Sequence, residues 1–493
     1  MSSDLIQRGL LAAKWGASST FLRFLLQVIA QAILARLLGP EAYGIFGAGL
    51  IIMAMTSLLT DVGFSWSLLR KTELSDADVQ FALTVQVTFG VLLGVLLYAT
   101  SDFLARHMAG EPVGWVIRLL AFSVVFNAAA STPSILLSRD LSYGHLGKGQ
   151  LLSYIAGYFF TGVPMALAGY GTIALVSAFL VQSIVRCGLM FFFSRLRWIP
   201  TFKHEFYRSF MGEGLLVFAT NMVNWLVYNV DRLIVSKIMP SQALGIYNVS
   251  ANLAGTPNAV LLGSIQPVFL ATGARLQNDG ALRSAYLGVL RAALLIAPAF
   301  YGTLAMNAES LVHILYGSRW ADASSVIAIL FLGMPFFVIW SVSTPILWNT
   351  GKPYQEAFFQ LPIIIFAALT CYFASFIGLA ALAIAADIVL FLRAVAMFMA
   401  ASRRVLLDWR DLVSVLWIGL AFLAITFCSG FVMGQIDTPD IVKLISSSVL
   451  TALACLALLR FLPYRLSRDS INTVGSISIK VSSMLRAKRC HNS

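Results

Sequence analysis

The residues of this chain that could bind a ligand are polar side chains set inside apolar stretches. Four of them, spaced three or four residues apart and so on one helical face, lie in the stretch 13–36: Thr20, Arg23, Gln27 and Gln31. An arginine surrounded by hydrocarbon is costly enough to make a functional role the default hypothesis. Because a guanidinium group pairs bidentately with phosphate oxygens, the predicted chemistry is non-covalent binding of an anionic, phosphorylated ligand.

A matching polar face occurs in the second half of the chain. The segment Ala35–Phe46 (ARLLGPEAYGIF) reappears as Ser236–Tyr247 (SKIMPSQALGIY), an ungapped offset of 201 residues. Shifted by that offset, the four polar positions become Asn221, Asn224, Tyr228 and Arg232. Two matched polar faces, one in each half, are what a water-filled central cavity requires. We therefore predict a ligand-binding translocation cavity lined by Arg23, Gln27, Gln31, Asn224, Tyr228 and Arg232.

A purely structural role for these polar residues stays open. Inside helical bundles, Gln, Asn and Tyr side chains often only hydrogen-bond to neighbouring helices. Arg232 lies near the end of its apolar stretch, close enough for its guanidinium group to reach the outer surface.

Two aspartates are candidates for ion coupling. Asp231 precedes Arg232, and its counterpart in the first repeat copy is Ala30. Asp387 lies near the middle of an apolar stretch, without a basic residue four positions later. Each is expected either to bind a coupling proton or ion, or to pair locally with a cation on another helix.

The remaining charges inside apolar stretches are arginines. Arg186, Arg291 and Arg393 are expected to reach the inner membrane surface, and Arg118 the outer one. Counting these four with Arg23 and Arg232 gives six arginines against two aspartates. Such a cationic interior favours an anionic cargo and disfavours a cationic drug.

The elements that must position these residues are membrane-spanning helices. Hydrophobic residues make up 59% of the 493 residues and charged residues only 11%, which is typical of a chain surrounded by lipid. We expect an all-α polytopic membrane protein of about 14 transmembrane helices. The predicted spans are 13–36, 44–62, 80–101, 113–137, 150–169, 172–194, 210–236, 242–268, 284–306, 323–348, 357–376, 378–400, 412–434 and 441–461.

The repeat divides these spans into two pseudo-symmetric six-helix bundles and two extra helices. The predicted domains are an N-terminal bundle (1–200), a C-terminal bundle (201–402), spans thirteen and fourteen (403–461), and a basic cytosolic tail (462–493).

The distribution of Lys and Arg predicts the orientation of the chain. With the N-terminus in the cytosol, the only Lys or Arg residues in outward loops are Arg36, Arg106, Lys237, Arg319 and Lys443. Because cytosolic loops are the basic ones, both termini are predicted to be cytosolic. The formal net charge of +12 then faces anionic membrane lipids, and no nucleic-acid partner is expected.

No pattern in the sequence predicts an enzyme. The five cysteines have no C-x-x-C spacing and the five histidines form no ligand pair, so neither a metal nor another cofactor is expected. Walker A, H-E-x-x-H and G-x-S-x-G motifs are missing from the sequence. We expect no catalytic residues and a transport process driven by an ion gradient or by the substrate gradient alone.

Two motifs give the chain a family resemblance. LARLLGPEAYGIF (Leu34–Phe46) and NVDRLIVSKIMPSQALGIY (Asn229–Tyr247) resemble polysaccharide-exporting, Wzx-type members of the multidrug/oligosaccharidyl-lipid/polysaccharide (MOP) flippase superfamily. The D-R-L-I segment is present at Asp231–Ile234, and the second copy replaces Gly39-Pro40 by Pro240-Ser241, which leaves its turn geometry open.

The resemblance implies a V-shaped pair of helical bundles in the bacterial inner (cytoplasmic) membrane. By alternating access they would flip polyprenyl-diphosphate-linked oligosaccharide repeat units for exopolysaccharide, capsule or O-antigen (lipopolysaccharide) biosynthesis. A polysaccharide polymerase and export machinery would be partners. An ion-coupled multidrug antiporter and a cell-wall lipid precursor flippase of the same superfamily remain alternatives, and a membrane glycosyltransferase is disfavoured by the short outward loops.

Overall fold

In the computed structural model, residues 3–71, 73–108, 112–202, 206–273, 279–349, 354–407, 409–434 and 439–461 are described. These residues form helices and contain no β-strand, so the predicted all-α class is confirmed. The predicted cytosolic tail, 462–493, lies outside the described residues.

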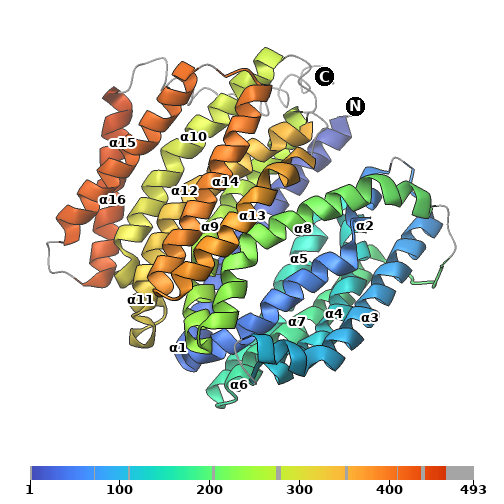
Figure 1. Ribbon diagram of the computed structural model, residues 1–493. Helices are drawn as coiled ribbons and strands as arrows, with labels where there is room; N and C mark the ends of the chain where they lie inside the picture. The colour runs from blue at the N-terminus through green and yellow to red at the C-terminus, as the bar shows by residue number, and fades with distance from the viewer. Residues whose placement is uncertain are drawn as a thin grey trace. The chain divides into compact units, whose positions relative to one another are not determined.

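The helices follow one another through short connections (Figure 1). Their bounds are α1 Ser3–Asp61, α2 Phe64–Arg70, α3 Asp76–His107, α4 Pro112–Arg139, α5 Tyr143–Tyr154, a π-helical turn Ile155–Gly162, α6 Val163–Leu167, α7 Thr172–Ser194, α8 Phe206–Ile238, α9 Ser241–Gly273, α10 Asp279–Met306, α11 Ala308–Leu315, a 3-10 turn Ser318–Trp320, α12 Ala323–Asn349, α13 Tyr354–Ser375, α14 Leu379–Arg404, α15 Trp409–Gly434 and α16 Asp440–Phe461.

Helix α1 contains the first two predicted spans, and Gly39 separates them. Gly39 has φ 78° and ψ 176°, outside the helical region, a conformation that only glycine adopts without strain. Pro40 follows, and its fixed φ suits the first turn of the next helical limb. In the second repeat copy the turn is made differently: α8 ends at Ile238 and Ser241 begins α9.

The apolar helices identify a multi-pass membrane protein. Among the described residues, eight helices are long and apolar enough to cross a membrane. Helix α7 has the bounds predicted for the sixth span. Large apolar side chains also point away from the protein, as Leu92 and Val95 of α3 do at 61% and 63% exposure. This pattern is expected where lipid replaces water around the helices. The full count of 14 spans and the two-bundle layout stay predictions.

The chain divides into two compact units. The N-terminal unit consists of Asp4–Leu253 and Gln360–Leu382, and the C-terminal unit mainly of Ala254–Phe359 and Ala383–Ser493. In the N-terminal unit, α4 packs between α3 and α7 (Figure 1). In the C-terminal unit, α10 packs against α12 and α15, and α15 against α16. The domain bounds drawn from the repeat stay a prediction.

One arginine lies elsewhere than at the surface predicted for it, and the surface placement of another, Arg118, stays a prediction. Arg393, expected at the inner surface, is buried in the C-terminal unit, and its guanidinium carbon lies 3.7 Å from the centroid of the Trp340 ring. A cation over an indole face is stabilised without reaching water. Arg118 is half-exposed; its Nε donates to the Ser101 hydroxyl at 2.9 Å and a terminal nitrogen pairs with Asp102.

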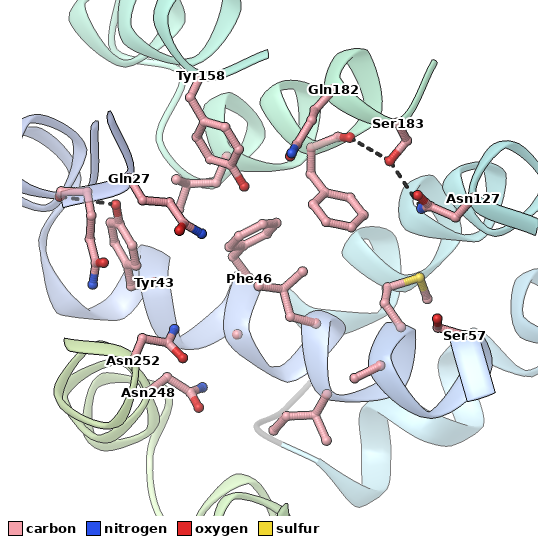
Figure 2. Close-up of a pocket in the computed structure, with 18 of the residues that line it drawn as sticks. Gln27, Tyr43, Phe46, Ser57, Asn127, Tyr158, Gln182, Ser183, Asn248 and Asn252 are labelled. Atoms are coloured by element: carbon pink, nitrogen blue, oxygen red, sulfur yellow. Dashed lines mark hydrogen bonds between the residues drawn. The ribbon is translucent and has the colours of Figure 1, made fainter. Parts of the chain in front are cut away.

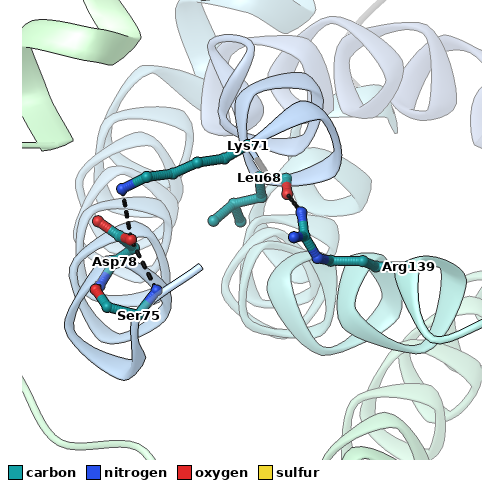
Figure 3. A network of polar contacts seen from close by, with 5 residues as sticks. All are labelled: Leu68, Lys71, Ser75, Asp78 and Arg139. Carbon is teal, nitrogen blue, oxygen red and sulfur yellow. Dashed lines mark hydrogen bonds and ion pairs between the residues drawn. The ribbon is translucent and has the colours of Figure 1, made fainter. Parts of the chain in front are cut away.

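A polar network holds the start of α3 against the end of α2 (Figure 3). The Lys71 Nζ atom lies 2.6 Å from Oδ2 of the fully buried Asp78. Asp78 and Ser75 also form a capping box, in which each side chain accepts from the backbone N–H of the other. Arg139, at the end of α4, donates to the Leu68 carbonyl oxygen at 2.8 Å. The network therefore fixes α2, α3 and α4 at one end of the N-terminal unit.

We expect Asp78→Ala to lower the free energy of unfolding by about 3 kcal/mol, because it removes a buried ion pair and a helix cap together. Asp76→Ala is the matched control: Asp76 is exposed in the same first turn, and its loss should change stability by less than about 0.5 kcal/mol. Thermal unfolding of the two purified variants in detergent measures the difference. Equal stability of both variants would contradict the structural role of the network.

Candidate substrate cavity

The N-terminal unit contains a cavity of about 580 Å³ (Figure 2). Binding pockets for small molecules typically measure roughly 300–1,000 Å³. Helices α1, α4, α5, α7, α8 and α9 and the π-helical turn supply its walls. Its polar lining residues are Gln27, Gln31, Tyr43, Ser57, Thr60, Asn127, Ser131, Tyr154, Tyr158, Gln182, Ser183, Arg186, Asn229, Arg232, Asn248 and Asn252.

Three of the six predicted lining residues are in this cavity: Gln27, Gln31 and Arg232. They come from both repeat copies, since Gln31 and Arg232 are equivalent positions 201 residues apart. The Arg232 guanidinium carbon also lies 5.5 Å from the centroid of the Tyr228 ring. The helical spacing of the polar residues therefore identified three residues, from both repeat copies, that line the same cavity.

Arg23 lies beside the cavity and is not part of its lining. Its Nη1 atom donates to Oε1 of Gln150, on α5, at 2.9 Å. It is close enough to Tyr154 and Arg186, which do line the cavity, to interact with them electrostatically. Its role in ligand binding remains a prediction.

Asn224 and Tyr228 are also outside the lining. The Asn224 side-chain oxygen accepts from Nε2 of Gln360, on α13, at 2.9 Å. Tyr228 is 40% exposed. Asn224 thus ties α8 to α13, and Tyr228 supports Arg232.

The two aspartates proposed for ion coupling occupy different units. The Asp231 carboxylate accepts from the Tyr247 hydroxyl at 2.5 Å and from the backbone N–H of Arg232 at 2.7 Å. Asp387, in the C-terminal unit, lies against Gly333 of α12, and its Oδ1 atom has no hydrogen-bond partner within the described part of the chain. Neither carboxylate lines the cavity.

Arg186 is the main residue that sequence reasoning placed wrongly. It was expected at the inner surface, yet it lines the cavity, and its Nε atom is buried there without a partner among the described residues. A sequence signal existed, because Gln182 lies one helical turn before it on the same face of α7. With Arg232 it gives the lining two guanidinium groups, and the described residues of the lining include no Asp, Glu, Lys or His.

Aromatic and amide side chains complete the walls. Tyr154 and Tyr158 stack with ring centroids 4.5 Å apart, on the stretch where α5 enters the π-helical turn. Asn127 donates to the Ser183 hydroxyl at 3.2 Å (Figure 2). The cavity is therefore cationic and rich in groups that hydrogen-bond to hydroxyl, amide and phosphate oxygens.

Helices α1 and α9, which both line the cavity, pack closely against each other. A Cβ atom on Gly44 would lie 1.7 Å from the carbonyl oxygen of Ser241, and one on Gly245 would lie 1.8 Å from that of Pro40. The two contacts are equivalent, because 40 and 44 become 241 and 245 on adding the repeat offset. Only glycine permits so close an approach of two backbones.

Comparison with known proteins identifies the family. The model of the family described as polysaccharide biosynthesis protein matches residues 33–325. The chain belongs to this family. This polysaccharide biosynthesis protein is 24% identical over 352 residues to the lipopolysaccharide biosynthesis protein WzxC of Escherichia coli, covering 70% of each chain. It is 22% identical over 342 residues to the succinoglycan biosynthesis transport protein ExoT of Rhizobium meliloti, covering 69% of this chain and 68% of that one.

Solved structures show the fold of this polysaccharide biosynthesis protein. The lipid II flippase MurJ, in an inward closed conformation, aligns with a TM-score of 0.71 at 15% identity, covering 90% of this chain and 98% of that one. An inward-facing multidrug resistance MATE family transporter of the MOP superfamily aligns with a TM-score of 0.62 at 14% identity, covering 80% of this chain and 98% of that one. The Wzx-type resemblance predicted from the two motifs is confirmed by the family match and by the relative WzxC.

We expect Gly245→Ala to lower the free energy of unfolding by about 1–3 kcal/mol, since the new methyl group meets backbone that cannot move away cheaply. Gly188→Ala, on α7, is the control: no atom lies within 4 Å of its added Cβ, so the helix propensity of alanine should stabilise it by up to about 1 kcal/mol. Thermal unfolding in detergent compares the two. A Gly245→Ala protein as stable as the Gly188→Ala protein would contradict the close contact.

Proposed function

We propose that this protein moves polyprenyl-diphosphate-linked oligosaccharide repeat units from the inner to the outer leaflet of the bacterial inner membrane. The observation that carries the proposal is the cavity, whose described lining residues include two arginines and no carboxylate. Membership of the polysaccharide biosynthesis family and the names of its relatives WzxC and ExoT support it.

The lining offers separate chemistry for the two polar parts of the cargo. Arg186 and Arg232 can each form paired N–H···O bonds with diphosphate oxygens. Removed from bulk water, these charge-assisted bonds offset the cost of taking a diphosphate into the membrane. Side-chain amides such as Gln27 and Gln182 offer both donors and acceptors to sugar hydroxyl groups. The polyprenyl tail would remain in the surrounding lipid.

The same lining disfavours a multidrug antiporter. A cationic drug would enter a space that already holds two guanidinium groups and, among its described lining residues, no compensating carboxylate, and like charges at short range repel. The fold alone does not separate these functions, because MurJ and the MATE transporter both share it. The positive charge of the cavity lining is what favours a flippase for an anionic cargo over an exporter of cationic drugs.

Transport in this proposal uses about 14 spans arranged as two six-helix bundles and two extra helices, with both termini in the cytosol. The bundles alternate in exposing the cavity to the two leaflets. The protein performs no covalent chemistry, and a polysaccharide polymerase and export machinery use the units it delivers. Asp231, held by Tyr247, and Asp387, beside Gly333, are the groups proposed to couple the cycle to a proton or another ion.

Deleting the gene in its host tests the proposal. We expect the surface polysaccharide to disappear while complete lipid-linked repeat units accumulate on the inner leaflet, because synthesis continues and only translocation is lost. Mass spectrometry of extracted lipids and leaflet-selective labelling of the sugars measure both effects. Polymer loss without accumulated units would move the protein to synthesis, and intact polymer with increased drug sensitivity would make it an antiporter.

We expect Arg186→Ala to reduce polymer export by about tenfold or more, since hydrogen bonds to a charged group contribute about 1.5–3 kcal/mol. Arg186→Lys should retain part of the activity, because it keeps the charge without the planar fork. Arg118→Ala is the matched control, as Arg118 is half-exposed and absent from the cavity lining. Export by the Arg186→Ala protein at the level of the Arg118→Ala protein, with equal expression, would remove Arg186 from the proposed site.

A further inference from the structure

A π-helical turn forms part of the cavity wall. It covers Ile155–Gly162, between α5 and α6, and the Thr161 hydroxyl donates to the carbonyl oxygen of Ala156, five residues earlier, at 3.0 Å. Turns of this kind are rare and occur frequently at functional sites. From this turn, Tyr158 lines the cavity, so the side chain that the turn contributes is the one to consider.

The turn packs closely against α7. A Cβ atom on Gly157 would lie 2.4 Å from the Ala178 carbonyl oxygen and 2.8 Å from Cβ of Gln182. Gln182 itself lines the cavity, so the residue before Tyr158 lies directly beside a lining residue of α7. The Tyr154 ring stacks on that of Tyr158 with an interplanar angle of 21°. These contacts hold the Tyr158 ring in place at the cavity wall.

The Tyr158 hydroxyl is open to the cavity. Figure 2 shows the side chain directed into the space that Gln27 and Gln182 also line. Tyr158 is partly exposed, and its hydroxyl is accessible and has no hydrogen-bond partner in the described part of the chain. The hydroxyl is therefore available to a molecule that enters the cavity.

Two fully buried tyrosines of the C-terminal unit differ from Tyr158 in this respect. The Tyr286 hydroxyl lies 2.8 Å from that of Ser343, and the Tyr301 hydroxyl donates to Oδ1 of Asn258 at 2.7 Å. Tyrosine hydroxyls inside proteins usually find such partners. For Tyr158 the partner must come from the cavity, as water or as a bound ligand.

The position of Tyr158 relative to Arg186 indicates which part of the cargo it meets. Gln182 precedes Arg186 by four residues on α7, a separation of about 6 Å along the helix. Arg186 is proposed to bind the diphosphate, so the group attached to the diphosphate reaches the level of Gln182 and Tyr158. In the proposed cargo that group is a sugar, whose hydroxyl groups both donate and accept hydrogen bonds, as a phenol does.

We infer that Tyr158 is a sugar-recognition residue, whose hydroxyl forms a hydrogen bond with a hydroxyl group of the sugar next to the diphosphate. The inference rests on the proposed function, since it assigns one contact within that cargo. A site that hydrogen-bonds a substrate hydroxyl discriminates against analogues that lack it. Tyr158 therefore contributes to the choice of repeat unit, whereas the arginines bind the diphosphate that every such unit carries.

Binding by the purified full-length protein tests this assignment. The two probes are lipid-linked repeat units, extracted from the deletion host, and polyprenyl diphosphate without sugars. Tyr158→Phe removes the hydroxyl and keeps the ring. We expect it to weaken binding of the repeat units about fivefold, the effect of one neutral hydrogen bond, and to leave binding of polyprenyl diphosphate unchanged.

Tyr98→Phe is the matched control. Tyr98 is exposed on α3 and lies outside the cavity lining, so this variant should bind both probes as the wild type does. Thermal unfolding separates recognition from folding. Tyr158→Phe should unfold at the wild-type temperature, whereas Tyr286→Phe should unfold at a lower one, because its hydroxyl is bonded to Ser343.

Each outcome decides the assignment. Weaker binding of the repeat units alone, with an unchanged unfolding temperature, supports it. Wild-type affinity of Tyr158→Phe for the repeat units would overturn it, as would equal weakening of both probes or a loss of stability like that of Tyr286→Phe; these results leave the proposed function intact. Failure of the wild-type protein to bind the repeat units would instead contradict the proposed function itself.

Discussion

Two glycines set the distance between the two copies of the internal repeat. At Gly44 and Gly245 the helices approach so closely that any Cβ atom would overlap a backbone carbonyl group. The two copies are 201 residues apart, and each contact is equivalent to the other. A glycine at the same position of each copy therefore allows two distant parts of the chain to pack together. Gly47 and Asn248, three residues beyond these glycines, both line the cavity, so the packing sets the separation of two of its walls. A carbonyl group there cannot move without disturbing its helix, which makes the contact a rigid constraint.

Departures from the repeat add further polar residues to one copy alone. Ala30 and Phe46 in the first copy correspond to Asp231 and Tyr247 in the second, which form a hydrogen bond to each other. In the cavity lining, Ile51 corresponds to Asn252. The shared residues are small or apolar and maintain packing, whereas these polar residues are present in one copy alone. A symmetric frame can thus hold an asymmetric cargo such as a lipid-linked oligosaccharide.

Much of the helical frame could be predicted from the sequence, because spans in lipid must be apolar and helical. The bounds of α7 were predicted correctly, and helical spacing identified Gln27, Gln31 and Arg232 as neighbours of one cavity. Spacing gives the face of a helix but not the helix that it meets. Arg23 could therefore be placed on a polar face, while its bond to Gln150 of α5 could not be foreseen.

The arginines also show that the sequence does not reveal which helix a side chain will contact. Arg186 and Arg393 lie near the ends of their spans in the sequence. Their long side chains were therefore expected to extend along the helix and place the guanidinium groups in water at the membrane surface. In the folded chain one borders the cavity and the other lies over the Trp340 ring. Which of these environments an arginine finds depends on tertiary packing between helices, and no periodicity within a single span encodes it.

The most direct test of the central claim is whether the cargo occupies the cavity. A single cysteine at Ser57, a lining residue that is itself exposed, can be introduced after the five native cysteines are replaced. Its reaction rate with a small thiol reagent is then measured with and without lipid-linked repeat units. The account predicts that these units slow the reaction, while a cysteine at Ser448 of α16 reacts unchanged. An equal rate at position 57 with and without cargo would contradict the assignment of this cavity to translocation.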